Sequence, residues 1–349
     1  MAQYKSGDQL SAASVRQWRV AQGAWWFAGL GIFFCLIFFP RTGILLFWNL
    51  LIPLAPALIV VAVGLWRNVC PLATTVLLPR HLGLSKQKLM SPTLHGVLGL
   101  ISIVALYALV PLRHSVFNLS GLATAGLLVG TATIGITMGF FFDWKSAWCS
   151  SLCPVHPVEK LYGSNVLFSL PNAHCQRCVK CVVPCPDTTP NINPASYHKT
   201  FSHNLSALLI VGGLPGFIWG WFQVPDNAGE WSWASVVAIY RLPLTGMMTT
   251  VLIYSVLTIV LEEKLTQRVT AVFSAAAVSC YYWYRIPALI GFGDYAHDGM
   301  LINLTGRVPG WLVVALTLSS TVFFFWWIVW RKSVRTSWVI RPAYASRHL

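Results

Sequence analysis

Charged residues are scarce in this sequence, and acidic residues are the scarcest. Only 10% of the 349 residues are charged, with 10 Asp and Glu against 24 Lys and Arg. Soluble domains are about one quarter charged, so the composition excludes a soluble globular protein. No carboxylate falls in the middle of an apolar run, which argues against a transmembrane proton relay or an ion-coupled transport site.

Several catalytic motifs are also missing. The sequence has no glycine-rich phosphate-binding loop, no nucleophile elbow around a serine and no zinc-protease motif. These absences exclude the common nucleotide hydrolases, serine hydrolases and zinc proteases that are recognised by such motifs.

Long apolar runs dominate what is present. The chain is 56% hydrophobic, contains 17 Trp and has a mean hydropathy of +0.63. Because about 20 apolar residues cross a bilayer as a helix, the sequence predicts an all-α integral membrane protein of about eight transmembrane helices. The predicted spans are 22–39, 44–66, 94–112, 120–142, 205–223, 243–261, 269–290 and 310–330. Trp collects at membrane interfaces, and most of these residues are expected to anchor helix ends.

The formal net charge of +14 is explained by the expected orientation of the chain in the membrane. With the N-terminus inside, every Lys and Arg lies on the cytoplasmic side except Arg41, Arg113, Arg241, Arg285 and Arg307. This bias fits the positive-inside rule. It predicts a multi-pass protein of the bacterial inner (cytoplasmic) membrane with both termini in the cytoplasm, and it removes the need for a nucleic-acid partner.

Six of the nine cysteines fall between Cys149 and Pro186. Cys175, Cys178, Cys181 and Cys185, followed by Pro186, form the spacing with which bacterial ferredoxins bind a [4Fe-4S] cluster. Short gaps let one tightly curled loop bring three thiolates to one cluster. The fourth cysteine of such a run can serve another cluster.

A second motif, Cys149-x3-Cys153-Pro154, precedes this run. Residues four apart on a helix share a face, so both thiols could reach one metal centre. The fourth ligand of the cluster is therefore either Cys153 or Cys185, with Cys149 nearby. His156 and His174 flank the cysteines and could tune a cluster or ligate it.

The cysteines divide the chain into three regions. Residues 1–142 form an N-terminal membrane region of four helices, 143–204 a cytoplasmic ferredoxin-like lobe that a metal could fold, and 205–349 a C-terminal membrane region of four helices. A degenerate repeat is indicated because Cys70-Pro follows the second helix as Cys153-Pro follows the fourth, with Trp66 in place of Cys149. Packing is favoured over ligation for Cys70.

Two histidines and two single cysteines lie at the ends of, or inside, the predicted spans. His95 and His203 begin two predicted spans on the lobe side, where an imidazole could accept a proton from quinol or simply hydrogen-bond at a helix end. No histidine is central in a span, so the sequence does not predict a bis-His haem. Cys35 and Cys280 lie inside spans and are interpreted as packing residues.

The two cysteine motifs resemble those of the NapH-type membrane ferredoxins, a group that includes membrane subunits of periplasmic nitrate reductase systems and the membrane halves of NosR- and CcoG-type proteins. The resemblance covers roughly residues 45 to 200. It implies several transmembrane helices, a [4Fe-4S] cofactor, and electron transfer from membrane quinol or a cytoplasmic donor to redox enzymes or metal centres.

This sequence departs from the resemblance in two respects. The family commonly has two intact C-x3-C-P motifs and two ferredoxin motifs, whereas here the first C-x3-C-P is broken at Trp66 and one ferredoxin run is present. Two clusters need about eight ligands, so one cluster is favoured, with a second only if Cys70 and a non-cysteine ligand join.

The leading hypothesis is a membrane-bound electron-transfer protein, an electron-transfer subunit that works between a donor, with quinone as one candidate partner, and a redox partner protein. An accessory protein that assembles or reduces a metal centre would carry the same cysteines, and Met247-Met248 is a weak copper signal. A third alternative is a zinc-stapled membrane docking subunit. The sequence identifies neither donor nor acceptor.

Overall fold

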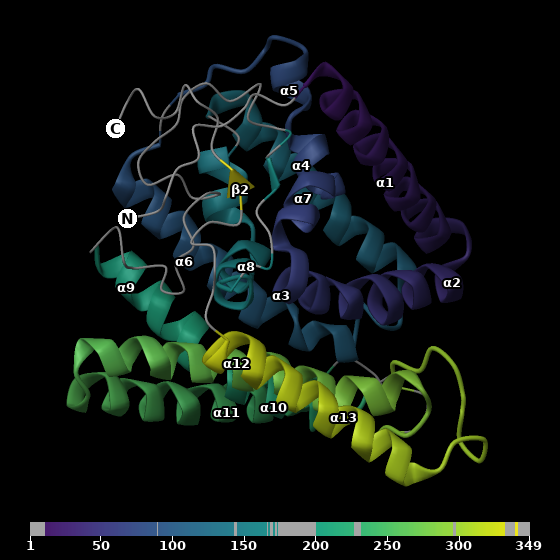
Figure 1. Cartoon of the computed structure of the whole chain (residues 1–349). Coiled ribbons are helices and arrows are strands. Elements are labelled where there is room, and N and C mark those ends of the chain that lie inside the picture. The colour runs from purple at the N-terminus through teal and green to yellow at the C-terminus, as the bar shows by residue number, and fades with distance from the viewer. Residues whose placement is uncertain are drawn as a thin grey trace.

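The computed structural model describes residues 11–88, 90–142, 145–165, 167, 170–171, 173, 200–226, 232–295, 298–331 and 339–340. Long helices dominate this part of the chain (Figure 1). In it, seven stretches are long and apolar enough to cross a membrane: Ala12–Phe38, Pro40–Val76, Pro92–His114, Gly121–Phe141, Phe201–Phe222, Trp233–Val260 and Gly310–Trp330. The expectation of an all-α, multi-pass membrane protein is confirmed.

Individual elements follow in chain order. The N-terminal half contains α1 (Ala12–Phe38), α2 (Pro40–Ile44), η1 (Leu45–Leu51), α3 (Ile52–Val69), α4 (Pro71–Val76), α5 (Leu78–His81), α6 (Pro92–Leu109), η2 (Pro111–His114), α7 (Gly121–Phe141), η3 (Lys145–Leu152) and α8 (Val155–Tyr162). The C-terminal half contains α9 (Phe201–Ala207), η5 (Leu208–Gly212), α10 (Gly213–Phe222), α11 (Trp233–Val260), α12 (Glu263–Leu289), α13 (Gly310–Phe325) and η6 (Trp326–Trp330). Two short strands, β1 (Leu170–Pro171) and β2 (Val339–Ile340), pair in parallel.

Helix α12 takes the place of the expected seventh span but is less apolar than the other long helices. It is 27 residues long, which is enough to cross a bilayer. Its buried face carries Thr270, Ser274, Ser279 and Arg285. These polar side chains turn toward other helices rather than toward lipid. They lower the mean hydropathy of α12, so a search by hydropathy does not select it as a membrane span.

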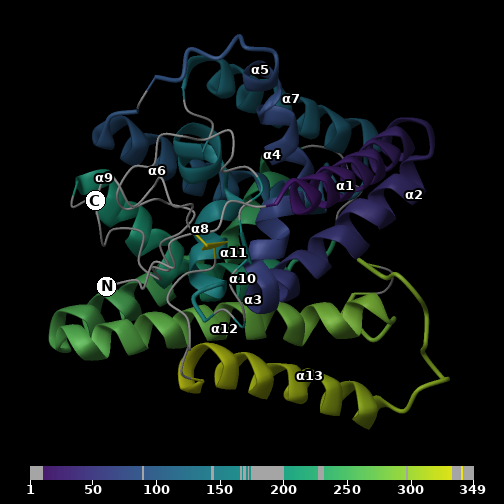
Figure 2. The ribbon, with the colours of Figure 1, turned by 45° about the horizontal axis from the view of Figure 1, so that its top comes forward.

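The main hydrophobic cluster joins the two halves of the chain. Ile59 and Ile103 from the N-terminal half pack in one cluster with Phe217 and Val278 from the C-terminal half. In two views, α12 and α13 lie side by side along one edge of the molecule (Figures 1 and 2). The helices on either side of the cysteine-rich segment therefore share one core.

Helices α10 and α11 approach each other closely along a row of glycines. Gly212, Gly216 and Gly220 recur every four residues and so line one face of a helix. A Cβ atom on Gly216 would collide with the carbonyl of Gly246 on α11, and one on Gly220 would collide with the carbonyl of Leu242. Small residues allow such backbone contact, which is a main source of helix association inside a membrane.

Four segments of the described chain are π-helical: η1, η3, η5 and η6. In each, a side chain donates a hydrogen bond to a main-chain carbonyl. Arg285 binds the Trp48 carbonyl at 2.9 Å and Tyr107 that of Leu209 at 2.8 Å. Asn165 donates to the carbonyls of Trp327 and Ile328 at 3.0 and 2.9 Å, and Ser151 to that of Ala147. Lipid cannot supply such bonds, so the side chains stabilise the irregular turns.

The glycine row gives a first prediction. Gly216→Val should destabilise the protein by about 1–3 kcal/mol, because the added side chain overpacks the α10–α11 contact. Thermal unfolding of detergent-solubilised protein, followed by tryptophan fluorescence, measures the effect. The matched control is Gly126→Val on α7, where a Cβ atom meets nothing within 4 Å. Equal melting temperatures for the two variants would contradict the assigned contact.

Candidate functional site

The two cysteines of the C-x3-C-P motif reach one buried cluster. Cys149 lies inside η3 and is buried, whereas Cys153 follows the last residue of η3 and is half-buried. Both pack with Trp148, Val76 and Leu77. The shared location is what residues four apart along a helix are expected to have.

Cys70 belongs to the same cluster. It joins the end of α3 to the start of α4 and packs against the group that contains Cys149 and Cys153. The sequence interpretation favoured a simple packing role, and Cys70 does pack there. Its neighbours, however, are the motif cysteines, so three thiols gather in one small region from segments about 80 residues apart in the sequence.

The two Cys-Pro pairs occupy comparable positions. Pro71 is the first residue of α4, and Pro154 immediately precedes α8. Proline is favoured at helix starts because its missing N–H would have no helical partner there. In both places the chain turns from one helix into the next at Cys-Pro.

A buried ionic network joins α3 to α8 beside the thiols. Arg67 on α3 places Nε 3.3 Å from Oε2 of Glu159 on α8. His156 Nδ1 lies 3.4 Å from the same carboxylate oxygen and 3.5 Å from an Nη atom of Arg67. All three residues are at least nine-tenths buried. Gly163, at the end of α8, allows this approach, because a Cβ atom there would press on Val63 of α3.

The surroundings shift two titrating groups. Burial raises the pKa of the Cys153 thiol to about 12, and the negative charge of Glu159 adds to the shift. Burial lowers the pKa of His156 to about 4, although its hydrogen bond to Glu159 opposes the change. At neutral pH His156 is therefore uncharged, and Cys153 is a protonated thiol that would release its proton on binding a metal.

The ferredoxin run lies outside the described residues. This applies to Cys175, Cys178, Cys181 and Cys185, and also to His174. Of the expected 143–204 lobe, the structure describes 145–165, 167, 170–171, 173 and the start of α9. Within the described part of the chain, no group of three or more His, Cys, Asp and Glu side chains is arranged to hold a metal ion.

His95 and His203, both noted from the sequence, are brought together. His95 Nδ1 lies 3.3 Å from His203 Nε2, between α6 and α9. One turn further along α6, Gly99 faces the carbonyl of Ser151, which lies between the two motif cysteines; a Cβ atom at Gly99 would be 3.9 Å from that oxygen. The histidine pair and the thiols thus share one end of α6.

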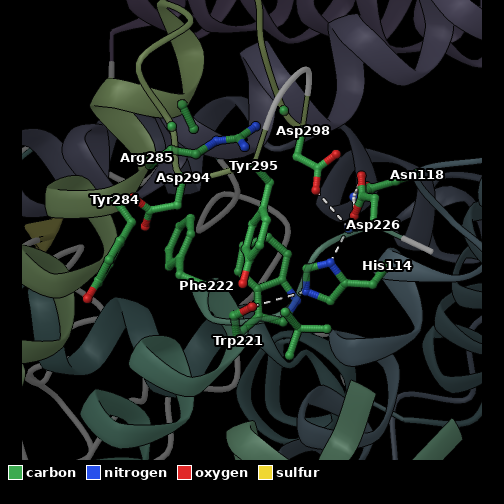
Figure 3. A pocket seen from close by; sticks show the side chains of 14 residues that line it. His114, Asn118, Trp221, Phe222, Asp226, Tyr284, Arg285, Asp294, Tyr295 and Asp298 are labelled. Carbon is green, nitrogen blue, oxygen red and sulfur yellow. Dashed lines mark hydrogen bonds and ion pairs between the residues drawn. The ribbon is translucent and has the colours of Figure 1, made fainter. Parts of the chain in front are cut away.

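A second polar site lies at the other end of α6, and nothing in the sequence pattern had singled it out. His114 Nδ1 lies 2.8 Å from Oδ1 of Asp226, and His114 Nε2 lies 3.1 Å from the Trp221 carbonyl oxygen (Figure 3). Asn118 donates to both carboxylate oxygens of Asp226, and Asp298 accepts from the main-chain N–H of Asp226 at 2.7 Å. Asp226 is therefore held by three neighbours.

This second pocket is small and lies at the opposite end of α6 from the histidine pair. Its cavity of about 50 Å³ holds roughly three to five water molecules at about 10–15 Å³ each. The 18 residues of α6 separate it from the histidine pair by about 27 Å at 1.5 Å per residue.

The chain matches no family model, no curated protein and no solved structure.

The buried ion pair gives a second prediction. Arg67→Met should destabilise the protein by about 3–5 kcal/mol, because it leaves the Glu159 carboxylate buried without its cation. Adding Glu159→Leu should recover most of the loss, since the apolar pair needs no charge compensation. Thermal unfolding of the two single variants and the double variant tests this cycle. Additive losses would mean that the two residues are not coupled.

His156 gives a pH-dependent prediction. Its folded pKa, about 4, lies below the ordinary 6.5, so the unfolded chain binds more protons between these values. The stabilisation from burying neutral His156 is complete above pH 6.5 and is lost as pH falls toward 4. Melting temperatures should therefore fall less over this range in His156→Gln than in the wild type. Parallel curves would contradict the burial of a neutral imidazole.

Proposed function

We propose that this protein is a membrane-bound [4Fe-4S] electron-transfer protein that passes electrons from a quinol or a cytoplasmic donor to a redox partner enzyme. The observation that carries the proposal is the burial of Cys149 and Cys153 in one cluster with Cys70, close in sequence to a ferredoxin-type run of four cysteines. We place the protein in the bacterial inner membrane with the cysteines at the cytoplasmic face, on the evidence of the Lys and Arg bias.

Each cysteine is assigned a role in binding the cluster. Cys175, Cys178 and Cys181 would ligate three iron atoms, and Cys153 or Cys185 would be the fourth ligand. When bound, the cluster would accept and give one electron at a time. Arg177 and Lys180 lie within the run, and their positive charges would favour the more negative, reduced cluster.

The buried groups around Cys153 suit this role. The apolar cluster keeps water away from the thiols, and low solvent exposure is one of the factors that set a cluster's potential. The Arg67–Glu159 contact fixes α8 against α3, so the two Cys-Pro turns keep their separation. A ligand on such a turn is held in place before the metal binds.

Iron analysis tests the proposal. Anaerobically purified protein should contain about four iron and four sulfide per chain and, after dithionite reduction, give the EPR signal of a reduced [4Fe-4S] cluster. About eight iron would indicate a second cluster and make Cys70 a candidate ligand. Zinc without iron would overturn the proposal and favour the zinc-stapled docking subunit.

Cysteine variants then identify the fourth ligand. If it is Cys153, Cys153→Ser should lose most of the EPR signal while Cys185→Ser keeps it, and the reverse holds if it is Cys185. The control is Cys280→Ser, because Cys280 lies on α12, away from the motif cluster. Full iron content in Cys175→Ser, Cys178→Ser and Cys181→Ser would contradict the assigned ligands.

A further inference from the structure

Two helices begin side by side at the thiol-bearing end of the molecule. His95 lies in the first turn of α6, and His203 in the first turn of α9. The two helices pack against each other and lie next to one another in both views (Figures 1 and 2). Thr200 immediately precedes α9 and caps it by accepting a hydrogen bond from the main-chain N–H of His203.

Three side chains form a continuous hydrogen-bonded chain at this point. Thr200 Oγ1 lies 2.7 Å from His203 Nδ1, and His203 Nε2 lies 3.3 Å from His95 Nδ1. The two imidazole planes differ by only 13°, with centroids 5.6 Å apart. The nitrogens therefore meet nearly head-on in one plane, so a shared proton has a direct path from one ring to the other.

Packing holds the His203 ring in this position. His203 is buried, with 5% exposed. A Cβ atom on Gly96 would be 2.6 Å from the His203 ring and 3.1 Å from Thr200 Oγ1, so only glycine at position 96 leaves room for the ring. The relay geometry is thus built into the α6–α9 contact.

The contact between the rings fixes how they can share a proton. Because His95 Nδ1 and His203 Nε2 lie 3.3 Å apart, one of these nitrogens must carry the N–H and the other must accept it. A neutral imidazole can take a proton on one nitrogen and release another from the opposite nitrogen.

We propose that His95, His203 and Thr200 form a proton relay, which takes up the proton that a hydroxyl-bearing electron donor of the hydroquinone type loses on oxidation. This inference rests on the proposed function, because the electrons need the [4Fe-4S] cluster as acceptor. Its support is the position of the relay one helical turn from the contact between α6 and the C-x3-C motif. A protein donor such as a ferredoxin releases no proton and needs no relay.

Oxidation of a hydroquinone releases two electrons and two protons. A hydroquinone breaks two O–H bonds, gives two electrons in succession to the oxidised cluster and becomes a quinone. The redox partner reoxidises the cluster between the two transfers. Each proton moves onto the imidazole pair, and the chain through His203 to Thr200 passes it on toward solvent.

The kinetic test compares two reductants on protein whose iron content has first been measured. In His203→Gln, cluster reduction by duroquinol should slow about 100-fold or more, the usual size of general-base effects. Reduction by dithionite, which supplies electrons without a hydroxyl proton, should keep the wild-type rate. His114→Gln, at the outer end of α6, is the matched control and should leave both rates unchanged.

Thr200 provides a conservative pair of variants. Thr200→Val removes the hydroxyl and should slow reduction by duroquinol alone, whereas Thr200→Ser retains the hydroxyl and the helix cap and should restore the rate. Equal slowing by both reductants in His203→Gln, or no slowing with duroquinol in either His203→Gln or His95→Gln, would overturn the relay. Absence of iron from the wild type would instead refute the proposed function.

A second measurement does not depend on the cluster. In protein labelled with nitrogen-15 in the histidine rings, the head-on contact should produce scalar coupling between His95 Nδ1 and His203 Nε2 across the shared hydrogen. The coupling should disappear in His95→Gln and persist in His114→Gln. A wild-type spectrum without this coupling would show that the rings do not share a proton, whatever the enzyme kinetics.

Discussion

The contact between Arg67 and Glu159 is the interaction on which the arrangement of the thiols depends. A buried arginine without its carboxylate would be strongly destabilising, so α3 and α8 are held at a fixed separation. Because Cys70 follows Arg67 by three residues and Cys153 precedes Glu159 by six, the same contact brings the two turns together.

Helix α6 connects two polar environments that differ in chemistry. One end carries the histidine pair beside the thiols, and the other carries His114 in a network with Asp226. Around this second site, Arg113 lies between the Trp48 and Trp221 rings, at 4.2 and 4.9 Å from their centroids. The aromatic faces attract this buried cation, so this end of the bundle tolerates charge that lipid would not.

Much of the fold could be predicted from the sequence, because a bilayer permits few kinds of spanning structure. Apolar runs of about 20 residues had to be helices, and seven of the eight expected spans meet that description in the structure. The eighth, α12, carries a row of polar side chains that lowers its mean hydropathy. Cys149 and Cys153 were recognisable by their spacing, and both enter one cluster.

Other features of the candidate site could not have been predicted from the sequence. Cys70 meets the motif cysteines, and His95 meets His203, through contacts between residues about 80 and 108 positions apart. No local pattern encodes such distances. Gly96 is visible in the sequence, but a single glycine in an apolar helix has many explanations. In the structure the His203 ring packs against it, so the glycine leaves room for that ring.

The π-helical segments bear on the order in which the chain folds. In η5 and η1, carbonyls accept hydrogen bonds from side chains of other helices, Tyr107 on α6 and Arg285 on α12 respectively. A helix entering the bilayer alone has no such donor and must satisfy its carbonyls as a regular α-helix. The backbone of these segments therefore reaches its final form only after the inserted helices associate, and a late rearrangement within already spanning helices belongs to the assembly of this protein.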